Sequence, residues 1–221
     1  DAGIDIDDIT SLLPAAMDSA QPLDMGLIYE ATAAAAYTSI GLDDSASHLI
    51  VVDMGAGTTD IAALARIGNR MFELPEARST LKQAGDFVDR VIANRALDAA
   101  KWAKTTDQQA HLWAELMRDM RDTKESLFED GRAAVRHRDK VFTIAIKDIE
   151  RDKDFQAFAK ELKAAYEHGV AVVRDDAAAR GRTNIEAVAV GGGAGAPFIQ
   201  ALIASKNTRG ARPRITPRPA T

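Results

Sequence analysis

Residues 48–60 read HLIVVDMGAGTTD, and this stretch decides the fold. The part before the first glycine is largely apolar and β-branched, a pattern typical of a strand buried on both faces. The glycines at positions 55 and 57 then predict a tight turn, and residues 59–66 predict a strand that returns beside the first. Together with the helix-like segments described next, these strands indicate an α/β fold.

The remainder of the chain alternates between strand-like and helix-like segments. We expect strands at 24–29, 70–75, 133–137, 141–146 and 185–190, and helices at 30–41, 84–102, 106–129, 155–173 and 197–205. The hairpin and helices between about residues 90 and 147 predict a small α+β subdomain, inserted between the core segments 1–89 and 148–204.

The composition is that of a folded domain. The chain has 221 residues, 46% of them hydrophobic, and no cysteine, which excludes disulfides, thiolate metal sites and cysteine nucleophiles. No stretch approaches the ~20 apolar residues of a membrane span, so we expect no membrane association. The chain opens at Asp1 without a signal-peptide pattern, and we expect a piece of a longer, cytoplasmic protein.

Charge is unevenly distributed along the chain. The net charge is −5, yet residues 205–221 include five basic side chains and no acidic one. Residues 1–204 therefore carry a net charge of −5 − 5 = −10. Such an acidic domain argues against a nucleic-acid-binding surface. The basic, proline-rich tail is predicted to be a flexible linker, and a phosphate-binding tail is the alternative.

The turn after the first strand carries groups that suit a phosphate and a cation. Two glycines in a tight turn expose backbone N–H groups, which form a nest for phosphate oxygens. Asp53 ends the buried strand, where a carboxylate needs a cation or donors, and hydrated Mg²⁺ would satisfy it. Thr58 adds a hydroxyl and Asp60 a second carboxylate. The alternative is an ordinary hairpin in which Asp53 only accepts turn hydrogen bonds.

A second glycine-rich loop lies near the C-terminal end. Residues 190–197 read VGGGAGAP, where a strand runs into a loop that opens a helix, so backbone can approach a flat or phosphorylated ligand. The loop partly fits a dinucleotide-binding fingerprint, but the acidic residue expected about 20 positions later is missing. No GxxxxGK[ST] motif occurs, which excludes a P-loop nucleotidase.

Four segments together resemble the seventy-kilodalton heat-shock chaperones of the DnaK type. Residues 30–35 (EATAAA) resemble their NEPTAAA segment, and 53–60 (DMGAGTTD) their DLGGGTFD. Residues 83–89 (QAGDFVD) are similar to their LGGEDFD, and 190–197 to their VGGSTRIP. The four occur in the family's order with compatible spacing, from about residue 25 to 204.

The resemblance implies a fold and a function. The fold would be a ribonuclease-H-like core of the actin-like ATPase superfamily, forming the second lobe of a two-lobed nucleotide clamp, with the small subdomain inserted. The cofactors would be ATP or ADP with Mg²⁺. The partners would be the first lobe of the same chain, missing here, together with co-chaperones or client proteins in the stress response.

The resemblance also implies a role for each matching residue. Asp53 would hold Mg²⁺ through water, and Glu30, Asp60 and Thr58 would lie near the metal and the attacking water. The residues implied to bind nucleotide are Gly55, Ala56, Gly57 and Thr58 at the phosphates, Gly85, Asp86 and Lys124 near the ribose, and Gly191, Gly192 and Gly193 behind the nucleoside.

Some positions depart from the family's pattern. Two arginines sandwich the adenine in the family, and their positions hold Glu125 and Gly195 here. Arg121 replaces the acidic residue of the family's ExxK segment. These changes put the base preference in question. The family's first-lobe DxGT hairpin and catalytic lysine are not found in the sequence, so we expect the 221 residues alone to hydrolyse ATP poorly.

Three other functions remain open at this point. An actin-like filament or scaffold protein would use nucleotide to control assembly. A small-molecule kinase of the same superfamily would transfer the phosphate to a hydroxyl or carboxylate. A degenerate pseudo-ATPase would use the same domain as an interaction module, a possibility motivated by Glu125 and Gly195.

Overall fold

A mixed sheet forms the centre of the molecule. The computed structural model describes residues 46–68, 70–101, 105–137, 140–204 and 213–215. In these residues, six strands form one sheet in the order β3-β2-β1-β7-β8, with β4 also paired to β2. The strands are β1 (His48–Met54), β2 (Thr59–Ile67), β3 (Arg70–Glu73), β4 (Ser79–Leu81), β7 (Ile185–Val190) and β8 (Pro213–Ile215).

The hairpin predicted from residues 48–60 is confirmed. β1 pairs antiparallel with β2, and Asp53 lies directly opposite Asp60. On its other side β1 pairs parallel with β7, and Asp53 is level with Val190. Every residue of β1 except Asp53 is buried, so this strand is covered on both faces as its apolar sequence requires.

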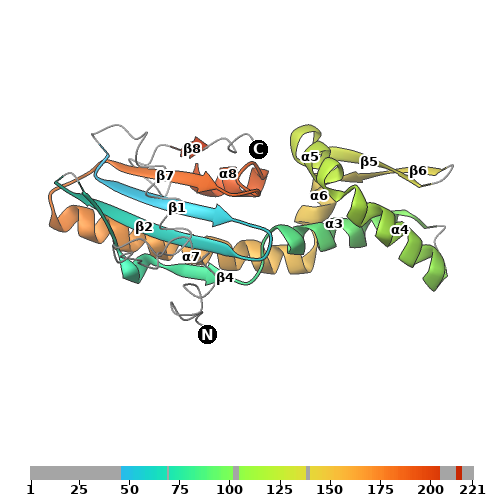
Figure 1. Ribbon diagram of the computed structural model, residues 1–221, viewed down its shortest axis with the longest axis horizontal. Coiled ribbons are helices and arrows are strands. Elements are labelled where there is room, and N and C mark those ends of the chain that lie inside the picture. Colours follow the sequence, from blue (N-terminus) through green and yellow to red (C-terminus); the bar gives the residue numbers. More distant parts are fainter. Residues whose placement is uncertain (1–45, 69, 102–104, 138–139, 205–212, 216–221) are drawn as a thin grey trace, which may run out of the picture. The chain divides into compact units, whose positions relative to one another are not determined.

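Helices cover one face of this sheet. Figure 1 shows the long helix α7 (Lys153–Ala179) running along the sheet. Its buried residues include Phe158, Tyr166 and Val173, which share one core with Ile50 of β1 and Ile61 of β2. Helix α8 (Pro197–Ile203) follows β7 and adds Ile199 and Ile203 to the same core. Leu49, Val51, Leu64 and Val188 form a smaller apolar cluster of alternate residues on the opposite face.

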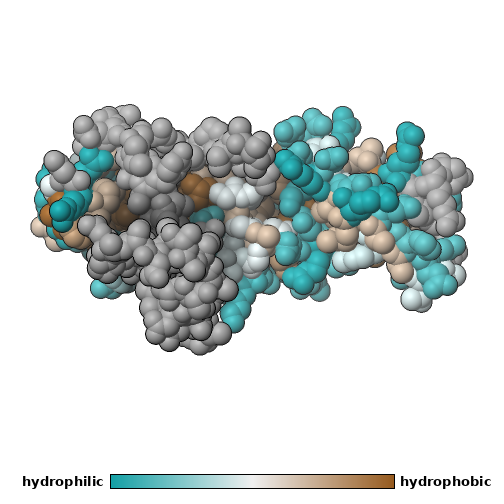
Figure 2. Space-filling view, viewed as in Figure 1, coloured by the Kyte–Doolittle hydropathy of each residue, from teal (hydrophilic) through white to brown (hydrophobic). Residues whose placement is uncertain are grey.

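A second, two-stranded sheet lies within residues 90–147, the range predicted for the inserted subdomain. β5 (Arg132–His137) pairs antiparallel with β6 (Lys140–Ala145). Helices α3 (Gly85–Ala99), α4 (Thr106–Arg118) and α5 (Met120–Asp130) pack with it. Figure 2 shows a largely hydrophilic surface over α4 and α5. The division of the chain into a core and an inserted subdomain stays a prediction.

The prediction of one helix over 106–129 is wrong, because the backbone leaves the helix at Asp119 and α5 starts anew. Asp119 has φ −104° and ψ 17°. Its carbonyl oxygen accepts both the N–H and the hydroxyl of Thr123, at 3.2 and 3.1 Å. Threonine hydroxyls that bond back one turn bend helices. The apolar spacing of Leu112, Leu116 and Met120 runs through the break, so periodicity could not reveal it.

Three further elements were not predicted from the sequence. A one-turn 3-10 helix, η2 (Pro75–Ala77), and the short strand β4 follow β3. Helix α6 (Ile146–Glu150) begins where the strand over 141–146 was expected to end. The carboxylate of Asp148 accepts the N–H of Ala145 at 3.1 Å, as the N3 side chain does in a capping box at the start of a helix.

The prediction of a flexible linker over 205–221 is wrong for residues 213–215. These residues form β8, which pairs parallel with β7 at the edge of the sheet, Val188 being level with Arg214. A proline at the first position of an edge strand costs no ladder bond that the strand needs.

Some predictions fall outside the described residues. These are the strand over 24–29, the helix over 30–41 and the site residue Glu30. Within the part of the chain that is described, none of the helices combines the length and the apolar character that crossing a membrane would require.

Candidate functional site

The two glycine-rich turns lie at the same edge of the sheet. β1 and β7 are parallel neighbours, so the segments that follow them leave the sheet side by side. Crevices beyond the carboxyl ends of parallel strands are where α/β proteins bind ligands. The N–H of Gly193 donates to the carbonyl oxygen of Met54 at 2.9 Å and ties the two turns together.

Glycine is required at two positions of the second loop. A Cβ atom on Gly191 would lie 2.5 Å from Oδ1 of Asp53 and 2.6 Å from the carbonyl oxygen of Met54. The φ angle of Gly191 is +81°, which other residues rarely adopt. A Cβ on Gly193 would lie 2.5 Å from the side chain of Met54. The loop therefore packs backbone against the end of β1, and only glycine allows that approach.

A third glycine joins the first turn to α3. The N–H groups of Gly85 and Asp86 donate to the carbonyl oxygens of Gly55 and Ala56, at 3.1 and 2.9 Å. The turn's carbonyls thus cap the start of α3. The turn itself is closed by the N–H of Gly55, which donates to the carbonyl oxygen of Thr58 at 3.0 Å.

The other N–H groups of the turn are available to a ligand. Ala56, Gly57 and Thr58 are exposed. Among the described residues, none of their three N–H groups donates to a backbone carbonyl. Consecutive N–H groups of this kind form a concave site for an anion. The phosphate nest predicted from the sequence stays a prediction.

Two carboxylates and two hydroxyls gather beside the turn. Asp53 and Asp60 are directly opposite on the paired strands, so their side chains share one face of the sheet. The Asp60 carboxylate accepts the hydroxyls of Thr58 at 2.8 Å and Thr80 at 2.5 Å. Thr80 comes from β4, a strand that was not predicted, so no sequence pattern pointed to Thr80 as part of this site.

This oxygen-rich corner fits a hydrated Mg²⁺. Like charges directly opposite on paired strands repel unless a cation or donors offset them. Among the described residues, no three carboxylate or imidazole groups gather closely enough to hold a metal ion by themselves. Mg²⁺ usually keeps several waters and binds through one or two carboxylates and the phosphates of its ligand. Asp53 fits that pattern.

A cleft of ≈ 580 Å³ opens between the glycine turns and α5. Eight of the predicted nucleotide-binding residues line it: Gly55, Ala56, Gly85, Asp86, Lys124, Gly191, Gly192 and Gly193. Four predicted residues, Asp53, Gly57, Thr58 and Asp60, belong to the adjoining hairpin and do not line the cleft itself. Their predicted roles at the phosphates and the metal are not tested by this arrangement.

Charged pairs occupy the α5 side of the cleft. Lys124 Nζ lies 2.8 Å from Oδ1 of Asp89 on α3, and both side chains are at least three-quarters buried. Arg121 donates from Nε to Oε1 of Glu125 at 3.0 Å, and this pair is exposed. Asp89 was not predicted as a site residue, although it lies one turn after Asp86 on the same face of α3.

Aromatic side chains hold the helices around the cleft in place. Phe198 of α8 makes edge-to-face contacts with Phe128 of α5 and Phe155 of α7, at ring-centroid distances of 6.4 and 5.2 Å. Phe87 of α3 packs against Phe158 of α7 at 5.4 Å. Each such pair adds about 0.5–1.5 kcal/mol beyond its buried area. Aromatic contacts therefore join the helices around the cleft, α3, α5 and α8, directly or through α7.

Comparison with known proteins agrees with the resemblance seen in the sequence. A family model described as Hsp70 protein matches residues 24–218, which is most of the chain. The match spans both glycine turns, α3, α5 and β8. No curated protein matches the chain in sequence.

Proposed function

Because the chain belongs to the Hsp70 family, we propose that its cleft binds ATP or ADP with Mg²⁺ as the second lobe of a chaperone nucleotide-binding domain. Proteins of this family are ATP-binding chaperones, and the mixed α/β fold agrees with an actin-like ATPase core. In the complete protein, nucleotide exchange and hydrolysis would change the angle between two lobes and so control client binding in the cytoplasm.

One observation carries this proposal. Three glycine segments, far apart in the sequence, converge on one cleft: the turn after β1, the start of α3 and the loop after β7. Backbone bonds join them, since Gly193 donates to Met54 and Gly85 donates to Gly55. A fold that only needed tight turns would not require all three to expose backbone to the same space.

The phosphate side of the proposed site is the turn after β1. The N–H groups of Ala56, Gly57 and Thr58 would bind phosphate oxygens, and Asp53 would hold Mg²⁺ through water. When bound, the metal would neutralise charge that develops on the transferred phosphoryl group. Asp60, whose carboxylate accepts the hydroxyl of Thr58, would fix that hydroxyl beside the phosphates. Glu30 is proposed to act near the attacking water.

The nucleoside side lies between α5 and the loop after β7. Gly191, Gly192 and Gly193 present bare backbone against which a flat ring could lie. Gly85 and Asp86 are proposed to face the ribose together with Lys124. Because Lys124 pairs with Asp89 at 2.8 Å, its ammonium is fixed between α3 and α5 at the edge of the cleft. A ribose hydroxyl would accept a hydrogen bond there without reorganising the lysine.

Hydrolysis by these 221 residues alone is not expected. Phosphoryl transfer needs charge neutralisation on several sides of the phosphate, and one hairpin with one metal ligand supplies one side. The sequence shows no second hairpin of the DxGT type. We therefore propose that the chain binds nucleotide and that turnover requires a first lobe.

Calorimetric titration of Mg-ADP into the chain tests the proposal, with Gly57→Val as the variant. A Cβ at Gly57 meets nothing within 4 Å, so valine fits the fold while its branched side chain covers the N–H nest. We expect at least tenfold weaker ADP binding and unchanged thermal unfolding. The matched control is Ala134→Val, an exposed position on β5. If the chain binds no Mg-ADP, or if Gly57→Val binds it normally, the proposed phosphate site is wrong.

A further inference from the structure

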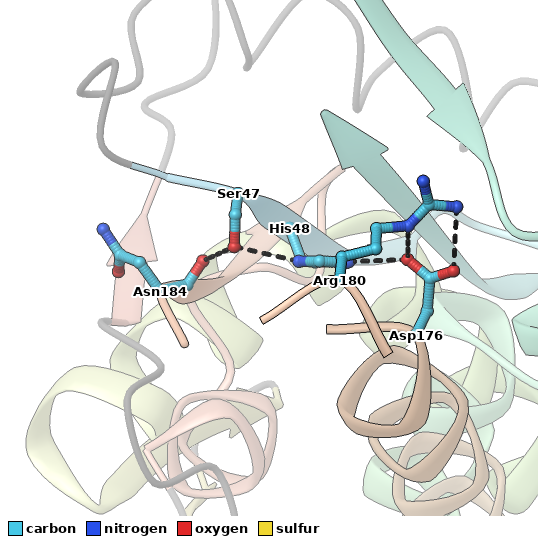
Figure 3. Close-up of polar contacts among 5 residues, drawn as sticks. All are labelled: Ser47, His48, Asp176, Arg180 and Asn184. Atoms are coloured by element: carbon cyan, nitrogen blue, oxygen red, sulfur yellow. Dashed lines mark hydrogen bonds and ion pairs between the residues drawn. The ribbon is translucent and has the colours of Figure 1, made fainter. Parts of the chain in front are cut away.

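A buried histidine forms a polar network at the end of the sheet opposite the cleft. His48 is the first residue of β1, and its side chain is 0% exposed. Both ring nitrogens have partners at 2.9 Å: Nε2 meets Oδ2 of Asp176 on α7, and Nδ1 meets Oγ of Ser47. Figure 3 shows the ring held between these two side chains. The proposed nucleotide site uses none of them.

The count of hydrogens in this network determines the charge of the ring. A carboxylate accepts only, so the contact with Asp176 places a proton on Nε2. The hydroxyl of Ser47 has a single proton, and it donates to the carbonyl oxygen of Asn184 at 2.8 Å. Toward Nδ1 the same hydroxyl can then only accept. The geometry points to a second ring proton on Nδ1, and so to an imidazolium.

The charged groups nearest the ring are one carboxylate and one guanidinium. Asp176 also accepts two hydrogen bonds from Arg180, at 2.6 and 3.0 Å. One carboxylate thus lies between two cations. From the neighbouring strands, Ala65 of β2 and Ile185 of β7 are level with the ring. The charged residues next to them, Arg66 and Glu186, project to the other face of the sheet.

A serine protease type of triad is excluded by this arrangement. The hydroxyl of Ser47 belongs to a residue that is only 7% exposed, and it donates away from the ring. A nucleophilic serine must donate to the histidine and must reach its substrate. The network is therefore a connection between structural elements.

We propose that His48 is a proton-operated latch, which in its doubly protonated form ties the starts of β1 and β7 to the last turns of α7. Asn184, just before β7, accepts the N–H groups of Ser47 and His48, at 2.9 and 3.2 Å, as well as the Ser47 hydroxyl. Loss of one ring proton leaves Nδ1 as an acceptor. The Ser47 hydroxyl then turns from Asn184 to Nδ1, and the ring loses its charge pairing with Asp176.

Ring-nitrogen NMR of the ¹⁵N-labelled chain tests the protonation state. At pH 5.5 we expect both nitrogens of His48 to be protonated, with two slowly exchanging ring N–H signals. At pH 8.5 we expect one bare nitrogen. His48 is assigned by its loss in His48→Gln. A single bare nitrogen at both pH values would overturn the proposal, and so would two protonated nitrogens at both.

Amide hydrogen exchange tests the latch itself. The amides of Ser47 and His48 report on their bonds to Asn184, and we expect them to exchange about tenfold faster at pH 8.5 than at pH 5.5 after correction for intrinsic rates. Amides of α5 should show no such change. His111→Gln, an exposed histidine on α4, is the control and should keep the effect.

A second variant covers the case in which His48→Gln does not fold. Ser47→Ala keeps the ring and Asp176 but removes the acceptor of the Nδ1 proton. At pH 5.5 the Nδ1–H signal should broaden or vanish through exchange while the Nε2–H signal stays. Unchanged protection of Nδ1–H in Ser47→Ala, or amide exchange that does not depend on pH in the wild type, would contradict the latch.

Discussion

Gly191 packs against Asp53 so closely that a Cβ atom at position 191 would lie 2.5 Å from Asp53 Oδ1. The carboxylate that ends β1 and the glycine that follows β7 are therefore parts of one unit. The loop after β7 therefore restricts where the Asp53 carboxylate can lie. This relationship explains why the chain needs glycine at a place where a tight turn alone would tolerate asparagine.

Alanine at Gly191 or Gly193 should destabilise the fold, whereas alanine at Gly195 should not. The first two changes place a Cβ within 2.5 Å of Asp53 or Met54, and Gly191 also has a φ of +81°. We expect losses of about 1–3 kcal/mol in unfolding free energy. Gly195 has nothing within 4 Å of its added Cβ, so Gly195→Ala should change stability by less than about 0.5 kcal/mol. Urea denaturation measures all three. If Gly193→Ala and Gly195→Ala lose the same unfolding free energy, close packing of the loop is not the cause of the destabilisation.

Removal of the Lys124 ammonium should weaken nucleotide binding. Lys124→Met keeps most of the side-chain volume but removes the charge that pairs with Asp89 at 2.8 Å. We expect a three- to tenfold rise in the Kd for Mg-ADP, corresponding to about 1 kcal/mol for one charged hydrogen bond. The control is Lys163→Met on α7, whose partner Glu167 lies 3.7 Å away outside the cleft. If both variants bind ADP like the wild type, Lys124 has no part in the site.

Arginine at position 125 should strengthen the binding of adenine nucleotides. Glu125 lines the cleft at a position where the family resemblance implies an arginine that stacks on the base. Such a stack is worth about 0.5–2 kcal/mol, so Glu125→Arg should bind ATP about 2- to 30-fold more tightly. Glu129→Arg changes the charge equally, one turn further along the cleft, and is the matched control. Equal gains in both variants would identify a general charge effect and remove the case for stacking.

Stability should fall on acidification because two carboxylates have lowered pKa values in the fold. Hydrogen bonds from Arg180 lower the pKa of Asp176 below its usual 3.8. Burial opposes this change, and the contact with His48 adds to it. Burial raises the pKa of Asp152, but the N–H of Phe155 and the guanidinium of Arg95 outweigh it, and the net change is downward. A lowered folded-state pKa gives stability that is complete above the unfolded value and lost as pH falls through the folded value.

Urea denaturation at pH 7, 4.5 and 3 measures this dependence. We expect stability to fall more steeply between pH 4.5 and 3 in the wild type than in Asp176→Asn. The variant has no carboxyl at position 176 to take up a proton on unfolding, so only Asp152 contributes. Asp98→Asn, an exposed carboxylate that lies 3.3 Å from Arg95, should keep the wild-type profile. A profile that is the same in wild type and Asp176→Asn would mean that this carboxylate is not linked to acid unfolding.

Much of the fold could be predicted because its signals are local. The apolar run of β1, the glycines after it and the period of α7 each reflect the geometry of one element. The break at Asp119 was missed because the buried stripe continues through it, from Leu116 to Met120. β8 was missed because three residues rich in proline and arginine look like a linker, whereas the strand forms by pairing with the distant β7.

The sequence by itself determined which segments turn tightly, which are buried, and that four family motifs follow one another in order. Only the tertiary structure decided which partners those residues have: Gly191 against Asp53, Lys124 with Asp89, Thr80 with Asp60, and His48 between Ser47 and Asp176. The physical reason is that periodicity and turn chemistry arise from neighbours along the chain. A hydrogen bond or close contact between distant residues instead depends on how strands and helices pack.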